Sequence, residues 1–186
     1  MLKKIPNILT ISRIVIIPLV LVCLYFAHQD FHSEFNDQAA TVLFIVAGIT
    51  DFFDGYLARV LQSQSKLGRV LDPIADKLLV VSCLVVLVFY NRADILPALA
   101  IICREILVSG LREFLAEIHI SVPVSKTAKI KTGMQMVALA LLLLGEKGSG
   151  YHWVETLGSS LLWLAAALTL FTGYAYLKAG LKHMEE

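Results

Sequence analysis

The chain has little charge and no clustered cysteines. Charged side chains make up 17% of its 186 residues and the formal net charge is +1, which argues against a nucleic-acid-binding surface. The three cysteines, Cys23, Cys83 and Cys103, stand apart inside apolar runs without metal-ligand spacing, so we interpret them as small core residues. No linker, composition shift or internal repeat divides the sequence, and we expect a single domain over residues 1–186.

Apolar residues are abundant instead. They make up 58% of the chain, with a mean hydropathy of +0.75, whereas soluble domains contain roughly 45 to 50%. Six apolar stretches occur, at residues 8–27, 39–50, 77–90, 95–111, 134–144 and 156–177. Several are shorter than the roughly 20 residues that cross a bilayer, so their helices must extend into polar flanks. We therefore predict an all-α polytopic membrane protein with six transmembrane helices.

The basic residues indicate the orientation of these helices. Of the 16 lysines and arginines, only Arg92 and Lys147 fall in loops assigned to the outside, and Arg104 lies within a span. This bias predicts that both termini are cytoplasmic. Residues 1–27 could also be interpreted as a secretory signal, but no A-x-A site follows them and five further spans do.

Four aspartates lie around the polar segment that joins the second and third stretches. Asp51 and Asp54 are three residues apart, and Asp72 and Asp76 are four apart, so each pair shares one face of a helix. Two antiparallel helices could aim all four carboxylates into one gap at the cytoplasmic membrane edge. Such a cluster needs a cation to offset its repulsion. Oxygen ligands favour Mg²⁺ or Mn²⁺, and two ions would suit phosphoryl transfer.

Small residues and one arginine accompany these acids. Gly55 and Gly68 would let a ligand approach the backbone closely, Ala58 is the small residue one turn after Gly55, and Arg59 could pair with a phosphate. Gly55 could also be a notch for helix packing.

Plainer interpretations of the aspartates stay open. Asp72 precedes Pro73, a pair typical of a helix start, so Asp72 could simply be an N-cap. Asp51 and Asp54 could be ordinary interfacial acids paired with Arg59 or Lys77, because acids near lipid are rarely left unpaired.

Basic residues further along could form a second, anion-binding pocket for a phosphorylated acceptor. The candidates are Arg104, Arg112, Lys126, Lys129 and Lys131. Arg104 lies deep in an apolar run and requires an anionic partner, either Glu105 or the acceptor itself. The three lysines could equally orient the helices and attract lipid headgroups.

The pattern D-x2-D-G-x2-A-R-x8-G-x3-D-x3-D, from Asp51 to Asp76, resembles the signature of the CDP-alcohol phosphatidyltransferase family at every fixed position. The segments "IPNILTISRI", "REILVSGLREF" and "KTAKIKT" extend the resemblance over essentially the whole chain. They are similar to bacterial members whose acceptor is glycerol 3-phosphate.

The resemblance implies a role for each matching residue. Asp51, Asp54 and Asp72 would be metal ligands, and Asp76 both a ligand and the base that deprotonates the acceptor alcohol. The CDP-diacylglycerol site would comprise Asn7, Thr10, Arg13, Gly55, Ala58, Arg59, Ser65 and Gly68. Thr10 could instead cap or decorate the first helix.

We therefore expect an enzyme of the bacterial inner membrane, with its active site facing the cytoplasm and membrane lipids as partners. It would transfer a phosphatidyl group from CDP-diacylglycerol to glycerol 3-phosphate, releasing CMP, and the resemblance suggests a homodimer. The nearest alternative is the same chemistry with serine or inositol phosphate as acceptor. A cation-coupled transporter is a further alternative, because acids and arginines within membranes also mark ion pathways.

Overall fold

The computed structural model describes residues 5–60, 66–117 and 126–182, and all of its regular structure is α-helical. The helices are α1 (Ile5–His28), α2 (Ser33–Val60), α3 (Lys66–Phe89), α4 (Ile95–Glu117), α5 (Lys126–Ser149) and α6 (His152–Lys182). The prediction of an all-α chain with six helices is confirmed for the described residues.

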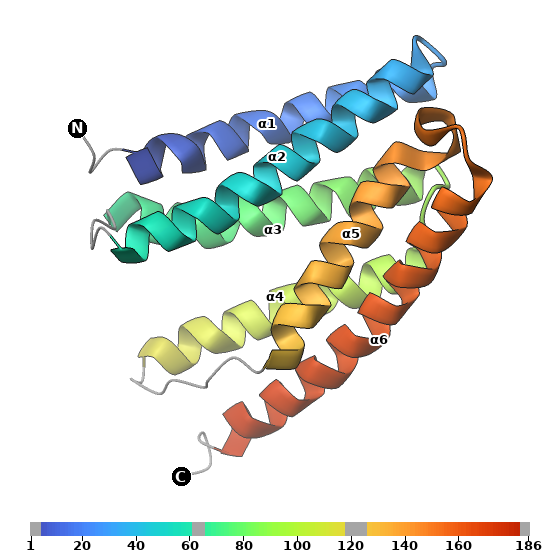
Figure 1. Ribbon diagram of the computed structural model, residues 1–186. Helices are drawn as coiled ribbons and strands as arrows, with labels where there is room; N and C mark the ends of the chain where they lie inside the picture. The colour runs from blue at the N-terminus through green and yellow to red at the C-terminus, as the bar shows by residue number, and fades with distance from the viewer. Residues whose placement is uncertain (1–4, 61–65, 118–125, 183–186) are drawn as a thin grey trace.

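Successive helices run in opposite directions (Figure 1). Helix α1 packs on α2 and α3, α2 packs on α5, and α6 packs on α4 and α5. The start of α1 and the end of α6 lie at the same end of the bundle as the ends of α2 and α4 (Figure 1). We call this the terminal end. The opposite, distal end carries the turns at residues 29–32, 90–94 and 150–151.

Two helices begin earlier than the polar segments suggested. The polar segment at residues 27–38 separates the first two apolar stretches, yet α2 starts within it, at Ser33. There the Asn36 amide donates hydrogen bonds to the carbonyl oxygens of Phe31 and His32, at 2.6 and 3.2 Å. Helix α3 starts at Lys66 and continues through Asp72. The interpretation of Asp72 as an N-cap is therefore wrong.

A buried ion pair joins three elements at the distal end. The Arg92 guanidinium donates two hydrogen bonds to the Asp37 carboxylate, from Nη1 to Oδ1 at 2.7 Å and from Nη2 to Oδ2 at 2.9 Å. Arg92 also donates to the Leu143 carbonyl at 3.3 Å. Gly145 follows with a φ of 59° and breaks the regular helix. A side chain at Gly145 would be strained in this conformation, so the glycine allows the bend beside Arg92.

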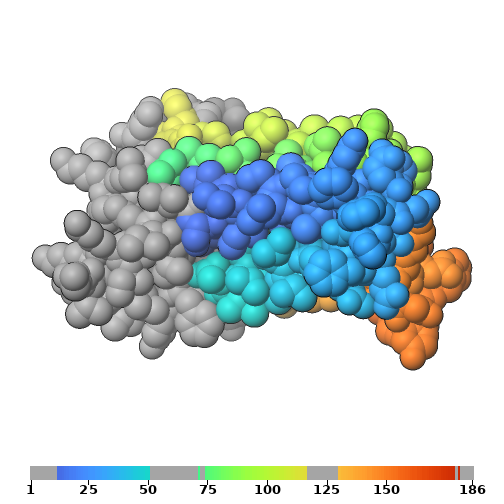
Figure 2. Space-filling view, turned by 90° about the horizontal axis from the view of Figure 1, so that it is seen from above, coloured from blue at the N-terminus to red at the C-terminus, as the bar shows by residue number. Residues whose placement is uncertain are grey.

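The core lies along the shared axis of the bundle and includes Leu24, Phe44, Leu84 and Leu142, each at most 1% exposed. Many large apolar side chains point outward instead, among them Phe89 at 75% and Phe171 at 72%. Figure 2 shows α1 and α2 side by side on one such face. Apolar surface of this extent favours contact with lipid or another protein.

One helical segment within the described residues has the length and apolar character of a membrane span, His152–Lys178. Ser12–His28 is a shorter apolar helix. The remaining helices carry more polar groups, as expected where short apolar stretches extend into polar flanks.

Candidate active site

The fold places the four predicted carboxylate positions on two consecutive helices. Asp51 and Asp54 lie in the last three turns of α2, and Asp72 and Asp76 lie in the first half of α3. Both segments belong to the terminal half of their helices (Figure 1). The side chains of Asp51, Asp54 and Asp72 lie outside the described residues, as do those of Gly55, Ala58, Arg59, Ser65 and Gly68.

Asp76 lines a small cavity of about 50 Å³ between α3, α4 and α5. Five apolar and five polar or charged side chains form the wall: Asp76, Lys77, Val80, Val81, Ile101, Ile102, Glu105, Thr132, Gln135 and Met136. The cavity therefore brings the predicted base into an enclosure of mixed polarity beside a second carboxylate. Such an enclosure has room for part of a small polar molecule rather than for a lipid.

Glu105 lies at the centre of a charged cluster next to this cavity. Its Oε1 accepts hydrogen bonds from Lys131 Nζ and, at 3.3 Å, from Arg104 Nη1. Lys131 is only 2% exposed, and its charged neighbours are Glu105, Arg104 and Asp76. Glu105 is therefore the anionic partner that the position of Arg104 required. Lys131, expected in the acceptor pocket, lies within electrostatic reach of the predicted base.

Arg104 owes its position to a glycine on α6. A Cβ placed on Gly173 would lie 2.9 Å from Arg104 Cγ, closer than real contacts allow. The absence of a side chain there lets the arginine stem pass between α4 and α6. The guanidinium reaches Glu105, while its Nε is buried without a hydrogen-bond partner in the described part of the chain.

The sequence analysis did not single out Gln135. Its side chain is 3% exposed and lies one helical turn after Lys131 on α5. Its Oε1 is buried with no hydrogen-bond partner among the described residues. A glutamine within the apolar run "MQMVALALLLL" was the available signal, because polar groups in such runs are seldom left without a role.

The other predicted residues divide into two groups. Arg112 is exposed on α4, with its guanidinium carbon 5.8 Å from the centre of the Tyr176 ring on α6, while Arg13 on α1 is fully buried. Asn7, Thr10, Lys126 and Lys129 lie on described helices, but their side chains are outside the described set.

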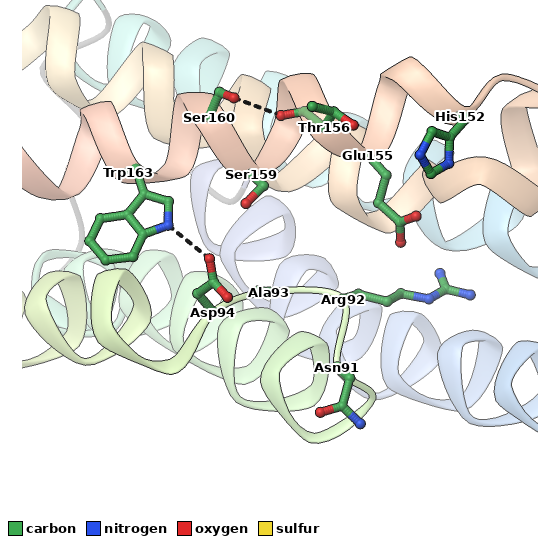
Figure 3. Close-up of a pocket in the computed structure, with 10 residues that line it drawn as sticks. All are labelled: Asn91, Arg92, Ala93, Asp94, His152, Glu155, Thr156, Ser159, Ser160 and Trp163. Atoms are coloured by element: carbon green, nitrogen blue, oxygen red, sulfur yellow. Dashed lines mark hydrogen bonds between the residues drawn. The ribbon is translucent and has the colours of Figure 1, made fainter.

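A larger cavity, of about 400 Å³, lies at the distal end between the α3–α4 turn and α6 (Figure 3). Several of its polar groups have hydrogen-bond partners within the protein. Trp163 Nε1 donates to Asp94 Oδ2 at 2.8 Å, Ser160 donates to the Thr156 carbonyl, and Arg92 is held by Asp37. None of the predicted site residues lines this cavity, so we place the candidate active site at Asp76.

The positions of the four aspartates along α2 and α3 are compatible with the expected metal site. Asp51 and Asp54 follow one face of α2, and Asp72 and Asp76 follow one face of α3. A donor set of four carboxylates suits hard divalent ions. Among the side chains that the structure describes, no three His, Cys, Asp or Glu residues form a metal-binding group. Of the four aspartates, only Asp76 is among these described side chains.

Comparison with known proteins identifies the family. The family model described as CDP-alcohol phosphatidyltransferase matches residues 3–171. The chain belongs to this family. It is 46% identical to CDP-diacylglycerol–glycerol-3-phosphate 3-phosphatidyltransferase of Rickettsia felis, over 97% of each chain. The proteins of the same name from Rickettsia prowazekii and Cereibacter sphaeroides are 48% and 39% identical, over 95% and 98% of each chain.

Proposed function

We propose that this chain transfers the phosphatidyl group of CDP-diacylglycerol to glycerol 3-phosphate, giving phosphatidylglycerophosphate and CMP. The similarity to relatives with that enzyme name, over nearly their whole length, carries the proposal. The cavity beside Asp76 supports it, because a general base must lie within reach of the hydroxyl it deprotonates. No feature of the described residues specifically favours serine or inositol phosphate as acceptor.

The acceptor would lie against Asp76. In this arrangement, Asp76 takes the proton from the 1-hydroxyl of glycerol 3-phosphate as that oxygen attacks the phosphorus next to diacylglycerol. The bond from that phosphorus to the CMP oxygen breaks, and CMP leaves. The apolar wall of Val80, Val81 and Ile101 limits competing attack by water.

Lys131 and Arg112, which we call the basic cluster, would bind the acceptor phosphate. Lys131 donates a hydrogen bond to Glu105 and is also attracted by the charge of Asp76. Arg112 lies on the same helix as Glu105, two turns nearer the terminal end. A dianionic phosphate held by two cations forms charge-assisted hydrogen bonds. Glu105 would then position Lys131 when the acceptor is absent, because a buried ammonium requires a counter-charge.

Asp51, Asp54, Asp72 and Asp76 would hold Mg²⁺ or Mn²⁺. The ions would neutralise the diphosphate and the departing CMP. Six membrane spans, cytoplasmic termini, an inner-membrane location and a homodimer remain predictions. The outward apolar side chains support contact with lipid.

The proposed reaction is tested by measuring CMP release from CDP-diacylglycerol with purified protein in detergent micelles. Release should require glycerol 3-phosphate, cease with EDTA and resume when Mg²⁺ or Mn²⁺ is added. Rapid CMP release without any acceptor would indicate hydrolysis instead of transfer. Full turnover in excess chelator would refute the metal requirement.

A further inference from the structure

The wall of the cavity beside Asp76 includes one residue whose role the proposed reaction leaves open. Gln135 lies in the wall, and its Oε1 has no hydrogen-bond partner among the described residues. A buried oxygen without a donor is unfavourable in a folded protein. Because Gln135 lines a cavity, a bound ligand is the natural source of the hydrogen-bond donor that its oxygen lacks.

The other polar groups of the same wall already have partners or a different chemistry. Glu105 accepts from Lys131 and Arg104, and Asp76 and Thr132 each take part in further interactions. Lys77 carries only donors. Among the described residues of the cavity wall, Gln135 is therefore the one whose fully buried side-chain oxygen has no hydrogen-bond partner.

The cavity's size and lining limit what could supply that donor. A volume of about 50 Å³ admits a few atoms of a small molecule. A phosphate would meet the Glu105 and Asp76 carboxylates and lacks a donor when fully ionised. An alcohol hydroxyl can donate to the Gln135 oxygen without adding charge to a small enclosure that already contains two carboxylates.

We propose that Gln135 recognises the hydroxyl on the middle carbon of the acceptor and so selects a vicinal diol phosphate over a simple primary alcohol phosphate. This inference rests on the proposed function, in which the neighbouring primary hydroxyl meets Asp76. Gln135 and Asp76 face one cavity from α5 and α3, so adjacent hydroxyls of one acceptor can meet them together. The phosphate then extends toward the basic cluster.

The selectivity is measured with two acceptors that differ in a single group. Glycerol 3-phosphate and 3-hydroxypropyl phosphate share the primary hydroxyl and the phosphate, but only the first has the middle hydroxyl. The wild-type protein should favour glycerol 3-phosphate in kcat/KM by about tenfold to a hundredfold, because the analogue leaves a buried acceptor unpaired. Gln135→Leu should bring this ratio close to one, mainly through a loss with glycerol 3-phosphate.

Thr169→Val is the matched control. Thr169 is also buried with its hydroxyl oxygen unpaired among the described residues, but it lies on α6 and does not line this cavity. The control should keep the wild-type ratio. If Gln135→Leu does not fold, Gln135→Met preserves the length of the side chain and gives the same comparison.

Two results would overturn the proposal. One is a wild-type ratio near one, which would mean that a solvent water satisfies Gln135 whichever acceptor is bound. The other is an unchanged ratio in the folded Gln135 variant. Both leave the transfer reaction intact, whereas wild-type protein that transfers nothing to glycerol 3-phosphate would refute the proposed function itself and this inference with it.

Discussion

The two ends of the bundle use buried charge in different ways. At the distal end, Asp37 and Arg92 satisfy each other through two hydrogen bonds, and Arg92 also reaches the Leu143 carbonyl. Around Asp76, Lys131 and Arg104 share one Glu105 oxygen, and Gln135 has an unsatisfied oxygen beside a cavity. A closed network suits a structural role, while an incomplete one beside a cavity suits ligand binding.

The largest expected effect lies at Asp76. Asp76→Asn removes the proposed base but keeps the size of the side chain, so turnover should fall by about a hundredfold to ten-thousandfold. CDP-diacylglycerol binding should remain measurable, because Asp51, Asp54 and Asp72 are unchanged. Single-turnover CMP release and equilibrium binding of the nucleotide lipid separate the two quantities. Normal turnover in this variant would eliminate Asp76 as the base.

Breaking the distal Asp37–Arg92 pair should lower stability and leave turnover nearly unchanged. Asp37→Asn leaves the Arg92 guanidinium buried without its counter-charge, and the loss of one partner of such a pair lowers the free energy of unfolding by about 3 to 5 kcal/mol. Turnover per folded molecule should stay within about twofold of wild type, because substitutions at distant sites without shared contacts act nearly independently. Thermal unfolding in detergent and the specific activity of the folded fraction measure the two effects. Lost activity with unchanged unfolding would reverse the roles assigned to the two ends.

A smaller effect is expected at the exposed edge of the basic cluster. Arg112→Ala should raise the apparent KM for glycerol 3-phosphate by about tenfold, because one charge-assisted contact to phosphate is lost. The KM for CDP-diacylglycerol should change little. Lys178→Ala removes an exposed cation from α6 and serves as the control for general charge loss. Equal changes for both substrates in Arg112→Ala would point to a topological role for Arg112.

The smallest effect is expected for the exposed distal ion pair. A hydrogen bond from Lys147 lowers the pKa of Asp30, so any stabilisation is present above the ordinary pKa of aspartate and is lost as the pH falls through the lowered value. Both side chains are more than half exposed, and solvent screens such pairs strongly. Lys147→Ala should therefore leave the unfolding temperature at pH 7 unchanged within error. A clear drop would show that the distal turns depend on this pair.

Patterns along the chain predicted six helices and the helical register of the aspartates, because apolar periodicity and i, i+3 or i+4 spacing are local properties. The Asp37–Arg92 pair was not predicted, since its partners are 55 residues apart. The role of Gly173 as space for Arg104 was missed for the same reason. The start of α2 at Ser33 lies inside the polar segment 27–38, where apolar periodicity gives no signal of a helix. Glu105 was correctly considered as a partner for Arg104, its immediate neighbour.

The central claim, that this chain makes a lipid from CDP-diacylglycerol and glycerol 3-phosphate, is tested most directly by identifying the product. Purified protein should be given CDP-diacylglycerol with equal concentrations of glycerol 3-phosphate, serine and inositol phosphate, and the lipids analysed by mass spectrometry. The account predicts phosphatidylglycerophosphate as the dominant product, with CMP formed in equal amount and neither formed by Asp76→Asn at a comparable rate. A predominance of the serine or inositol phosphate lipid would contradict it.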